Sequence, residues 1–164
     1  MDTLFDANDN YFIDLNRISV QEKIEKKNGL SYLSWAYAWG ELKKRYPDAV
    51  YTIYENKDGW CYHTDGKTCW VKTGVTVNGI EHVEYLPVMD FKNRSISAED
   101  VTSFDVNKAI QRSLTKAVAR HGLGLYVYAG EDLPEDDPLH EIENKAKAAG
   151  ITIIAEEDKP HCSN

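Results

Sequence analysis

Two stretches of the chain repeat their hydrophobic positions at helical spacing, and they predict two long helices. The first, LSYLSWAYAWGELKKRYP (residues 30–47), is expected to begin at Ser31 or Ser34 and to end before Pro47. The second covers roughly residues 103–121, and Gly122 is well placed to close it. In the second helix the cations and the apolar residues fall on separate faces, which leaves an apolar face for packing.

Between these helices, three runs rich in β-branched and aromatic residues predict strands. The runs are AVYTIYE, TCWVKTGVTV and IEHVEYLPV. The dipeptide Asn78-Gly79 separates the last two runs, and Asn-Gly in this position is the strongest short-range hairpin signal. The order is α, β, β, β, α. It predicts an α+β fold with a small antiparallel sheet or long β-hairpin packed on two main helices.

The two ends of the chain differ from this central part. Residues 1–28 are polar apart from the cluster Tyr11 to Leu15, and they are predicted to form an N-terminal arm or a short strand. Residues 29–134 form the predicted domain. Residues 135–164 are predicted to be a partly flexible acidic tail, in which a short helix from about Pro138 to Ala149 and an apolar run at residues 151–154 are possible elements.

Composition and charge refine this organisation. The 164 residues are 42% hydrophobic and carry a formal net charge of -8, as expected for one globular domain. Residues 1–130 hold 16 Lys and Arg against 17 Asp and Glu, whereas residues 131–164 hold 3 against 10. The acidity therefore belongs to the tail, and the cations of the body can form a patch. Because no apolar run reaches membrane-spanning length and no basic leader is present, we expect a soluble cytosolic protein with reduced cysteines.

The second predicted helix carries a stripe of cations. No Asp or Glu occurs between Val106 and Gly130, and on a helical wheel four cations fall within 120°. The stripe consists of Lys108, Arg112, Lys116 and Arg120. Like charges four residues apart repel each other, so the stripe indicates an anion opposite it. A long polyanion, the acidic tail and a neighbouring subunit are open alternatives, as is a plain solvated face.

The first predicted helix combines aromatic rings with cations. Tyr32, Trp35, Tyr37, Trp39 and Tyr46 lie beside the run Lys43-Lys44-Arg45. Rings that stack on bases and cations that hold phosphates together bind single-stranded nucleic acid. The alternative is that the rings are packing residues and that the cations complement the C-terminal dipole of the helix.

Other constellations indicate no metal site and no catalytic site. Cys61, His63 and Cys69 offer three ligands, but a structural zinc site needs four, usually from paired motifs. The acidic residues after Gly130 lack the spacing of a calcium-binding loop. GLGLYVYAG follows a helix instead of preceding one, so it is not a phosphate loop. We therefore expect a protein that is not an enzyme and uses no cofactor.

Two segments together resemble a known family. GLSYLSWAYAWGELKKRYP and SFDVNKAIQRSLTKAVARHGLGLYVYAGEDLP are similar to the phage single-strand DNA annealing proteins of the Sak type. These proteins form a branch of the superfamily of the eukaryotic annealing and recombination-mediator protein. The resemblance covers about residues 20–134. It implies an α+β fold, ring or helical homo-oligomers, single-stranded DNA held by its backbone in a basic groove, and no nucleotide hydrolysis.

The resemblance also implies site residues. Lys116 matches a basic DNA-contacting position of the family, and Arg112 and Arg120 lie one helical turn to either side of it. Thr115 and Ala119 stand where the eukaryotic branch has further cations. In the first helix Tyr37 stands at a family arginine, which moves the prediction to Lys43, Lys44 and Arg45. The predicted DNA-binding set is Lys108, Arg112, Lys116, Arg120, Lys43, Lys44, Arg45, Tyr37 and Tyr46.

The function expected from these observations is single-stranded DNA binding and annealing in phage homologous recombination, without ATP, in a bacterial host cell. The alternative is a phage-derived protein-binding module whose basic helix docks an acidic partner. Three roles stay open for the acidic tail, namely repelling DNA from other faces, docking a single-strand-binding protein or host recombinase, and aiding solubility.

Overall fold

The computed structural model describes residues 10–131, 146 and 148–150. The chain divides into two compact units, residues 1–129 and residues 130–164. All the elements named below belong to the first unit. The predicted tail of residues 135–164, with its helix and apolar run, lies almost entirely outside the described residues, so its boundary stays a prediction.

An antiparallel sheet forms the centre of the first unit. Its longest strand, β5 (Cys69–Val77), pairs from Trp70 to Val77 with β6 (Ile80–Pro87) across the turn Asn78-Gly79. The short strands β3 (Val50–Ile53) and β4 (His63–Thr64) both pair with the other edge of β5. The predicted hairpin is confirmed, because both turn residues adopt the positive φ that an Asn-Gly turn requires.

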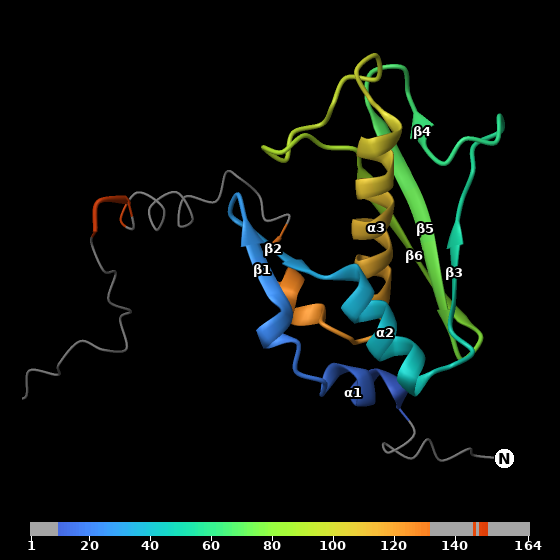
Figure 1. The fold of residues 1–164 in the computed structure, drawn as a ribbon, viewed down its shortest axis with the longest axis vertical. Coiled ribbons are helices and arrows are strands. Elements are labelled where there is room, and N and C mark those ends of the chain that lie inside the picture. The colour runs from blue at the N-terminus through green and yellow to red at the C-terminus, as the bar shows by residue number, and fades with distance from the viewer. Residues whose placement is uncertain (1–9, 132–145, 147, 151–164) are drawn as a thin grey trace, which may run out of the picture. The chain divides into compact units, whose positions relative to one another are not determined.

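The helix α3 (Ser103–Arg120) crosses one face of this sheet (Figure 1). It begins in a capping box, in which Thr102 and Asp105 each bond the other's backbone N–H, and this confirms the predicted helix start. Alternate side chains of β5 point at α3 and are buried, including Val71 and Val75. A hydroxyl pair fixes the contact at its centre, where Thr73 Oγ1 lies 2.7 Å from Ser113 Oγ.

The helix α2 (Trp35–Arg45) begins at Ser34, whose side chain accepts a hydrogen bond from the backbone N–H of Tyr37. The alternative start at Ser31 is wrong, because Ser31 lies in the strand β2 (Leu30–Leu33). This strand pairs with β1 (Ile24–Lys27) across the turn Asn28-Gly29. Residues 30–33 are therefore half of a second hairpin and not a first turn of helix.

The N-terminal segment contributes to the core. The described residues 10–28 form α1 (Tyr11–Asn16), the 3₁₀ helix η2 (Gln21–Lys23) and β1, whereas the sequence predicts an arm or a short strand over residues 1–28. Leu15 and Val20 are fully buried in the core that α2, β5 and α3 share. The strand is therefore present, and the residues before it pack on the fold.

The end of α3 meets this N-terminal segment. Gly122 has a φ of 121°, and a Cβ at this position would lie 2.5 Å from the carbonyl oxygen of Phe12. Only glycine combines this backbone angle with so close an approach. The chain then forms the 3₁₀ helix η3 (Leu125–Tyr128), which packs against β2 and α3. The architecture confirms the α+β prediction, and no helix among the described residues has the length and apolar character needed to span a bilayer.

Candidate nucleic-acid interface

A groove lies between α3 and the hairpin β1–β2, and we call it the α3–hairpin groove. It consists of two adjoining pockets of about 250 Å³ and 480 Å³, which share the lining residues Tyr32, Trp35, Gln111 and Arg112. The smaller pocket extends to Lys116 and to Tyr128 of η3. The larger pocket extends the other way, to residues of the β1–β2 turn, to Lys108 and to the loop after β6.

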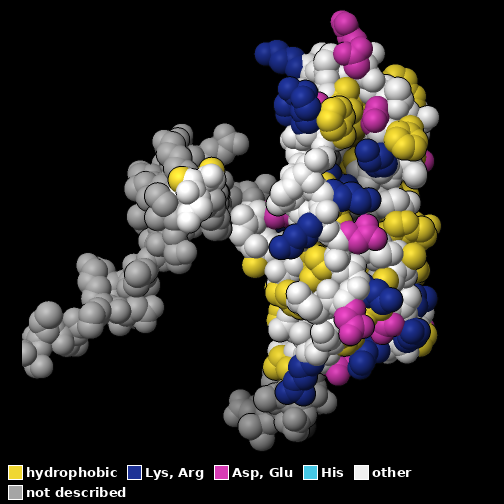
Figure 2. Space-filling view, turned by 60° about the vertical axis from the view of Figure 1, so that its left-hand side comes forward, with side chains coloured by type: hydrophobic (Ala, Val, Ile, Leu, Met, Phe, Trp, Pro, Cys, Tyr) yellow, Lys and Arg dark blue, Asp and Glu magenta, His cyan; other side chains and the backbone are white. Residues whose placement is uncertain are grey.

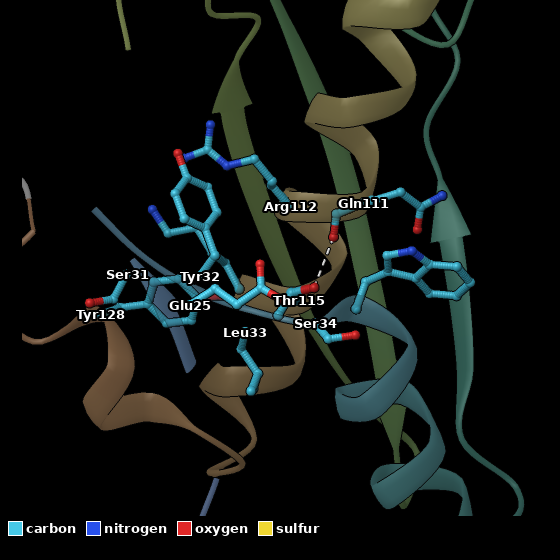
Figure 3. Close-up of a pocket in the computed structure, with 11 residues that line it drawn as sticks. Glu25, Ser31, Tyr32, Leu33, Ser34, Gln111, Arg112, Thr115 and Tyr128 are labelled. Carbon is cyan, nitrogen blue, oxygen red and sulfur yellow. Dashed lines mark hydrogen bonds between the residues drawn. The ribbon is translucent and has the colours of Figure 1, made fainter. Parts of the chain in front are cut away.

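Arg112 stands at the centre of this groove. Its guanidinium carbon lies 4.8 Å from the centre of the Tyr32 ring, and Figure 3 shows the two side chains next to each other. Among the described residues no carboxylate pairs with Arg112. Guanidinium stacked on a ring keeps its N–H groups in the plane, where they can donate to a phosphate. Tyr32 therefore holds the cation in place without neutralising it.

Two further cations of α3 line the groove beside aromatic rings. The Lys116 ammonium lies 5.5 Å from the centre of the Tyr128 ring, and the Lys108 ammonium lies 5.6 Å from that of Phe104. Both are one helical turn from Arg112, on the same side of α3. Three of the four cations in the predicted stripe thus share one groove.

The fourth cation, Arg120, pairs with the sheet. Its Nε donates to Oε2 of Glu84, and its Nη2 lies 3.4 Å from Oε1 of the same carboxylate. Glu84 is a residue of β6 whose side chain is only 11% exposed, and its hydrogen bond raises the pKa of Arg120. Arg120 does not line the α3–hairpin groove. Its predicted contact with DNA stays a prediction, and the ion pair gives it a structural role.

The three predicted cations of α2 make local contacts at the end of that helix. Lys43 donates to the backbone carbonyls of Pro47 and Ala49, the latter at 3.1 Å. Lys44 pairs with Glu41 at 2.8 Å, which raises the pKa of this lysine, and Arg45 lies 3.8 Å from Asp14. None of the three lines the groove around Arg112. They sit where the helix dipole favours cations.

Tyr37 and Tyr46 are both half-buried and pack against the core around Leu42. The Tyr46 hydroxyl donates to Asp14 at 3.3 Å, and the Tyr11 ring meets the Tyr46 ring edge-on at 5.9 Å. Neither tyrosine lines the groove. Their rings contribute to packing in this structure, and a role in DNA binding stays a prediction.

The hairpin side of the groove was missed by sequence reasoning. Its turn residue Asn28 donates to the carbonyl oxygen of Phe91, and the Tyr32 hydroxyl lies 3.3 Å from the Asn93 side chain. These two contacts tie the hairpin to the loop after β6. Phe91 is 69% exposed at the edge of the larger pocket. The dipeptide Asn28-Gly29 was the available signal for this hairpin.

Acidic residues also line the groove, but each has its own partner. Glu25 pairs with Lys27 at 3.5 Å. Asp90 accepts hydrogen bonds from backbone N–H groups of its loop and pairs with Arg94, and these bonds lower its pKa. The face drawn in Figure 2 shows the same mixture, with Lys and Arg along its length and Asp and Glu among them. The carboxylates that line the groove thus have partners other than Arg112.

The described residues contain no group of three or more His, Cys, Asp or Glu that could hold a metal ion. Cys61 is an exposed thiol, whereas Cys69 is a buried thiol of β5 that packs in the core.

Comparisons with known proteins identify a family for this chain. No curated protein and no solved structure matches it. The family model of the Sak Single Strand Annealing Protein matches residues 10–158. This match includes every element described above, the α3–hairpin groove among them. The chain therefore belongs to the Sak single-strand annealing protein family.

Proposed function

We propose that this protein binds single-stranded DNA in the α3–hairpin groove and anneals complementary strands during phage homologous recombination, in the cytoplasm of the bacterial host. Membership of the Sak family supports annealing as the activity. The observation that carries the proposed site is Arg112, a cation that lies against the Tyr32 ring and pairs with no carboxylate among the described residues.

The groove favours contact with the DNA backbone. Lys108, Arg112 and Lys116 follow one another at one-turn intervals, so their heads can meet successive phosphates of an extended strand. Contacts of this kind fix the path of the strand and read no sequence. Bases on the far side of the backbone then stay accessible to a complementary strand.

Annealing needs no energy source beyond pairing. Each stacked base-pair step stabilises a duplex by about 1.4 kcal/mol, so the reaction proceeds downhill once two strands are aligned. The protein's task is to hold a strand extended and to screen the repulsion between the two backbones. We therefore propose that it acts without ATP hydrolysis and is not an enzyme.

We further propose that the protein works as a homo-oligomer, in a ring or a filament. One groove covers only a few nucleotides, so a continuous path requires an array of subunits. Among the described strands β6 pairs only with β5, which leaves its second edge with backbone groups available to another copy. Light scattering that found only monomers, with and without DNA at tens of micromolar protein, would contradict this part of the proposal.

The test of the proposed site is the salt dependence of oligonucleotide binding. Fluorescence anisotropy with a labelled dT oligonucleotide gives the slope of log affinity against log salt. Arg112→Ala should weaken binding and reduce this slope by about 0.7, the value for one phosphate contact on a single strand. Lys57→Ala is the matched control, because Lys57 is an exposed cation on the loop between β3 and β4.

Two outcomes would contradict the proposed site. Unchanged slopes in both Arg112→Ala and Lys116→Ala would place the DNA elsewhere on the protein. A wild-type protein that binds no oligonucleotide but binds an acidic protein through α3 would instead support a protein-docking module.

A further inference from the structure

A third pocket, lined by aromatic rings, lies between α2, β3 and α3. Its volume is about 160 Å³. The rings are those of Trp35, Trp39 and Tyr51, and the remaining apolar lining is Ile53, Leu114 and Val118. The Gln111 amide and the Thr115 hydroxyl are its polar groups. We call it the aromatic pocket.

The rings of Trp35 and Tyr51 are exposed in this pocket, whereas Trp39 is partly buried against the core. Trp39 and Tyr51 meet edge to face, with centroids 5.5 Å apart and planes at 85°. Trp35 is 52% exposed and Tyr51 is 54% exposed. Exposed aromatic surface beside a hollow indicates a site for a ligand with an apolar face.

The aromatic pocket adjoins the α3–hairpin groove. Trp35, Gln111 and Thr115 line both. Gln111 and Arg112 are consecutive residues of α3, and Figure 3 shows their side chains extending to opposite sides of the helix. Because the two pockets share these three lining residues, a strand whose phosphate is held by Arg112 can place a neighbouring base at the aromatic pocket.

Of the two polar groups of the pocket, the Gln111 amide is suited to the edge of a base. The Gln111 side-chain amide makes no hydrogen bond among the described residues, although its backbone carbonyl accepts one from Thr115 Oγ1 at 2.9 Å. An amide both donates and accepts, so it can meet the hydrogen-bonding edge of any base. The pocket thus offers stacking from its rings and one adaptable polar contact.

We propose that the aromatic pocket takes one nucleobase of the strand held in the α3–hairpin groove. This inference rests on the proposed function and adds to it a contact with the base itself. A cavity of roughly 150 Å³ admits a benzene ring, so the pocket fits a pyrimidine as it stands, whereas a purine has to widen it. Binding should therefore prefer pyrimidine runs.

The test compares a dT oligonucleotide with an abasic oligonucleotide of the same length. Both present the same phosphates, so the ratio of their affinities reports the contribution of the bases. Stacking of one base on aromatic side chains should make the ratio between about 5 and 150 for the wild-type protein. The dT oligonucleotide should also bind more tightly than dA, and it should quench tryptophan fluorescence where the abasic one does not.

Tyr51→Leu is the deciding variant, because it removes a ring of the aromatic pocket and leaves Arg112 in place. The ratio should fall towards 1 while the affinity for the abasic oligonucleotide stays unchanged. Tyr85→Leu is the matched control, since Tyr85 is equally exposed, at 56%, on β6 and does not line the pocket. Its ratio should equal that of the wild type.

The outcomes separate this inference from the proposed function. A wild-type protein that binds neither oligonucleotide contradicts the proposed function. Equal binding of both, or an unchanged ratio in Tyr51→Leu, overturns only the base pocket. A change of oligomeric state in Tyr51→Leu with an unchanged ratio would show that a second copy of the chain covers the pocket, which also overturns the inference. If Tyr51→Leu does not fold, base-dependent quenching in the wild-type protein decides.

Discussion

Arg120 offers the sharpest test of which cations of α3 stabilise the fold and which ones bind DNA. In sequence it continues the stripe of Lys108, Arg112 and Lys116, yet in the structure it pairs with Glu84 on β6. The perturbation is Arg120→Met, which keeps an apolar stem on the helix and removes the guanidinium. It leaves the Glu84 carboxylate, with an 11% exposed side chain, without its ion-pair partner.

The expected loss of stability follows from the exposure of the two partners. Breaking a fully buried ion pair costs about 3–5 kcal/mol, whereas an exposed pair contributes about 0.2–1 kcal/mol. Arg120 is 56% exposed and Glu84 is nearly buried, which places this pair between the two limits. We expect Arg120→Met to lower the free energy of unfolding by about 1–3 kcal/mol. A chain of this length should then lose about 2–4 °C in Tm for each kcal/mol.

The assay is urea denaturation followed by the DNA salt titration described for Arg112. Arg120→Met should lower the urea midpoint and leave the slope of log affinity against log salt unchanged. The double variant Arg120→Met, Glu84→Gln should recover much of the stability, because no charge is then left buried. An unchanged urea midpoint together with a slope reduced by about 0.7 would refute this reasoning and place Arg120 on the DNA.

Three further predictions follow from the structure. His121 is fully buried, its Nδ1 accepts from the Tyr11 hydroxyl at 2.9 Å, and burial lowers its pKa. Below about pH 6.5 the imidazole of His121 is therefore protonated in the unfolded chain but still neutral in the folded chain. The free energy of unfolding should fall there by up to about 1.4 kcal/mol per pH unit. His121→Gln should show a shallower dependence in urea titrations at pH 5.5 and 7.5, and an equal dependence would contradict this. Gly122→Ala should cost at least about 2 kcal/mol, because it places a methyl group against the Phe12 carbonyl, and a change below 0.5 kcal/mol would contradict that contact. Removing residues 135–164 takes away eight acids and three lysines, so the net charge moves from -8 to -3. If the tail screens the groove, DNA binding should tighten at low salt and the gain should shrink at high salt, whereas a large drop in Tm would show that the tail belongs to the fold.

The parts of the fold that the sequence predicted are those specified by residues close together in the chain, such as turn dipeptides and helix caps. Asn78-Gly79 specifies its hairpin because the turn needs two positive φ values and the flanking runs are rich in β-branched and aromatic residues. The start of α3 follows from the side chains of Thr102 and Asp105, which lie within one turn of it. Asn28-Gly29 has the same turn chemistry, but IEKK before it is almost wholly polar. Because this run holds one β-branched residue and no aromatic residue, the sequence did not distinguish a strand from an arm.

The candidate site was predicted less completely, because its partners are distant in sequence. The helical wheel correctly grouped Lys108, Arg112 and Lys116 on one side of α3. It could not show that Arg120 meets a carboxylate 36 residues earlier, or that Tyr32 lies across Arg112. Those facts depend on the rotation of α3 over the sheet and on the position of the β1–β2 hairpin. Neither the rotation of α3 nor the position of the hairpin can be predicted from the spacing of residues within one helix or strand.

The buried hydroxyl pair of Thr73 and Ser113 has a consequence for the direction in which the Arg112 side chain points. Apolar packing alone lets a helix roll on a sheet, because such contacts have little directionality. A roll of about 20° would move the surface of a helix with a 10–12 Å diameter by about 2 Å. A hydrogen bond of 2.7 Å between two fully buried side chains does not survive such a shift. Ser113 follows Arg112 directly in the sequence, so this bond fixes the rotation of α3 on the sheet and keeps the neighbouring guanidinium directed into the α3–hairpin groove.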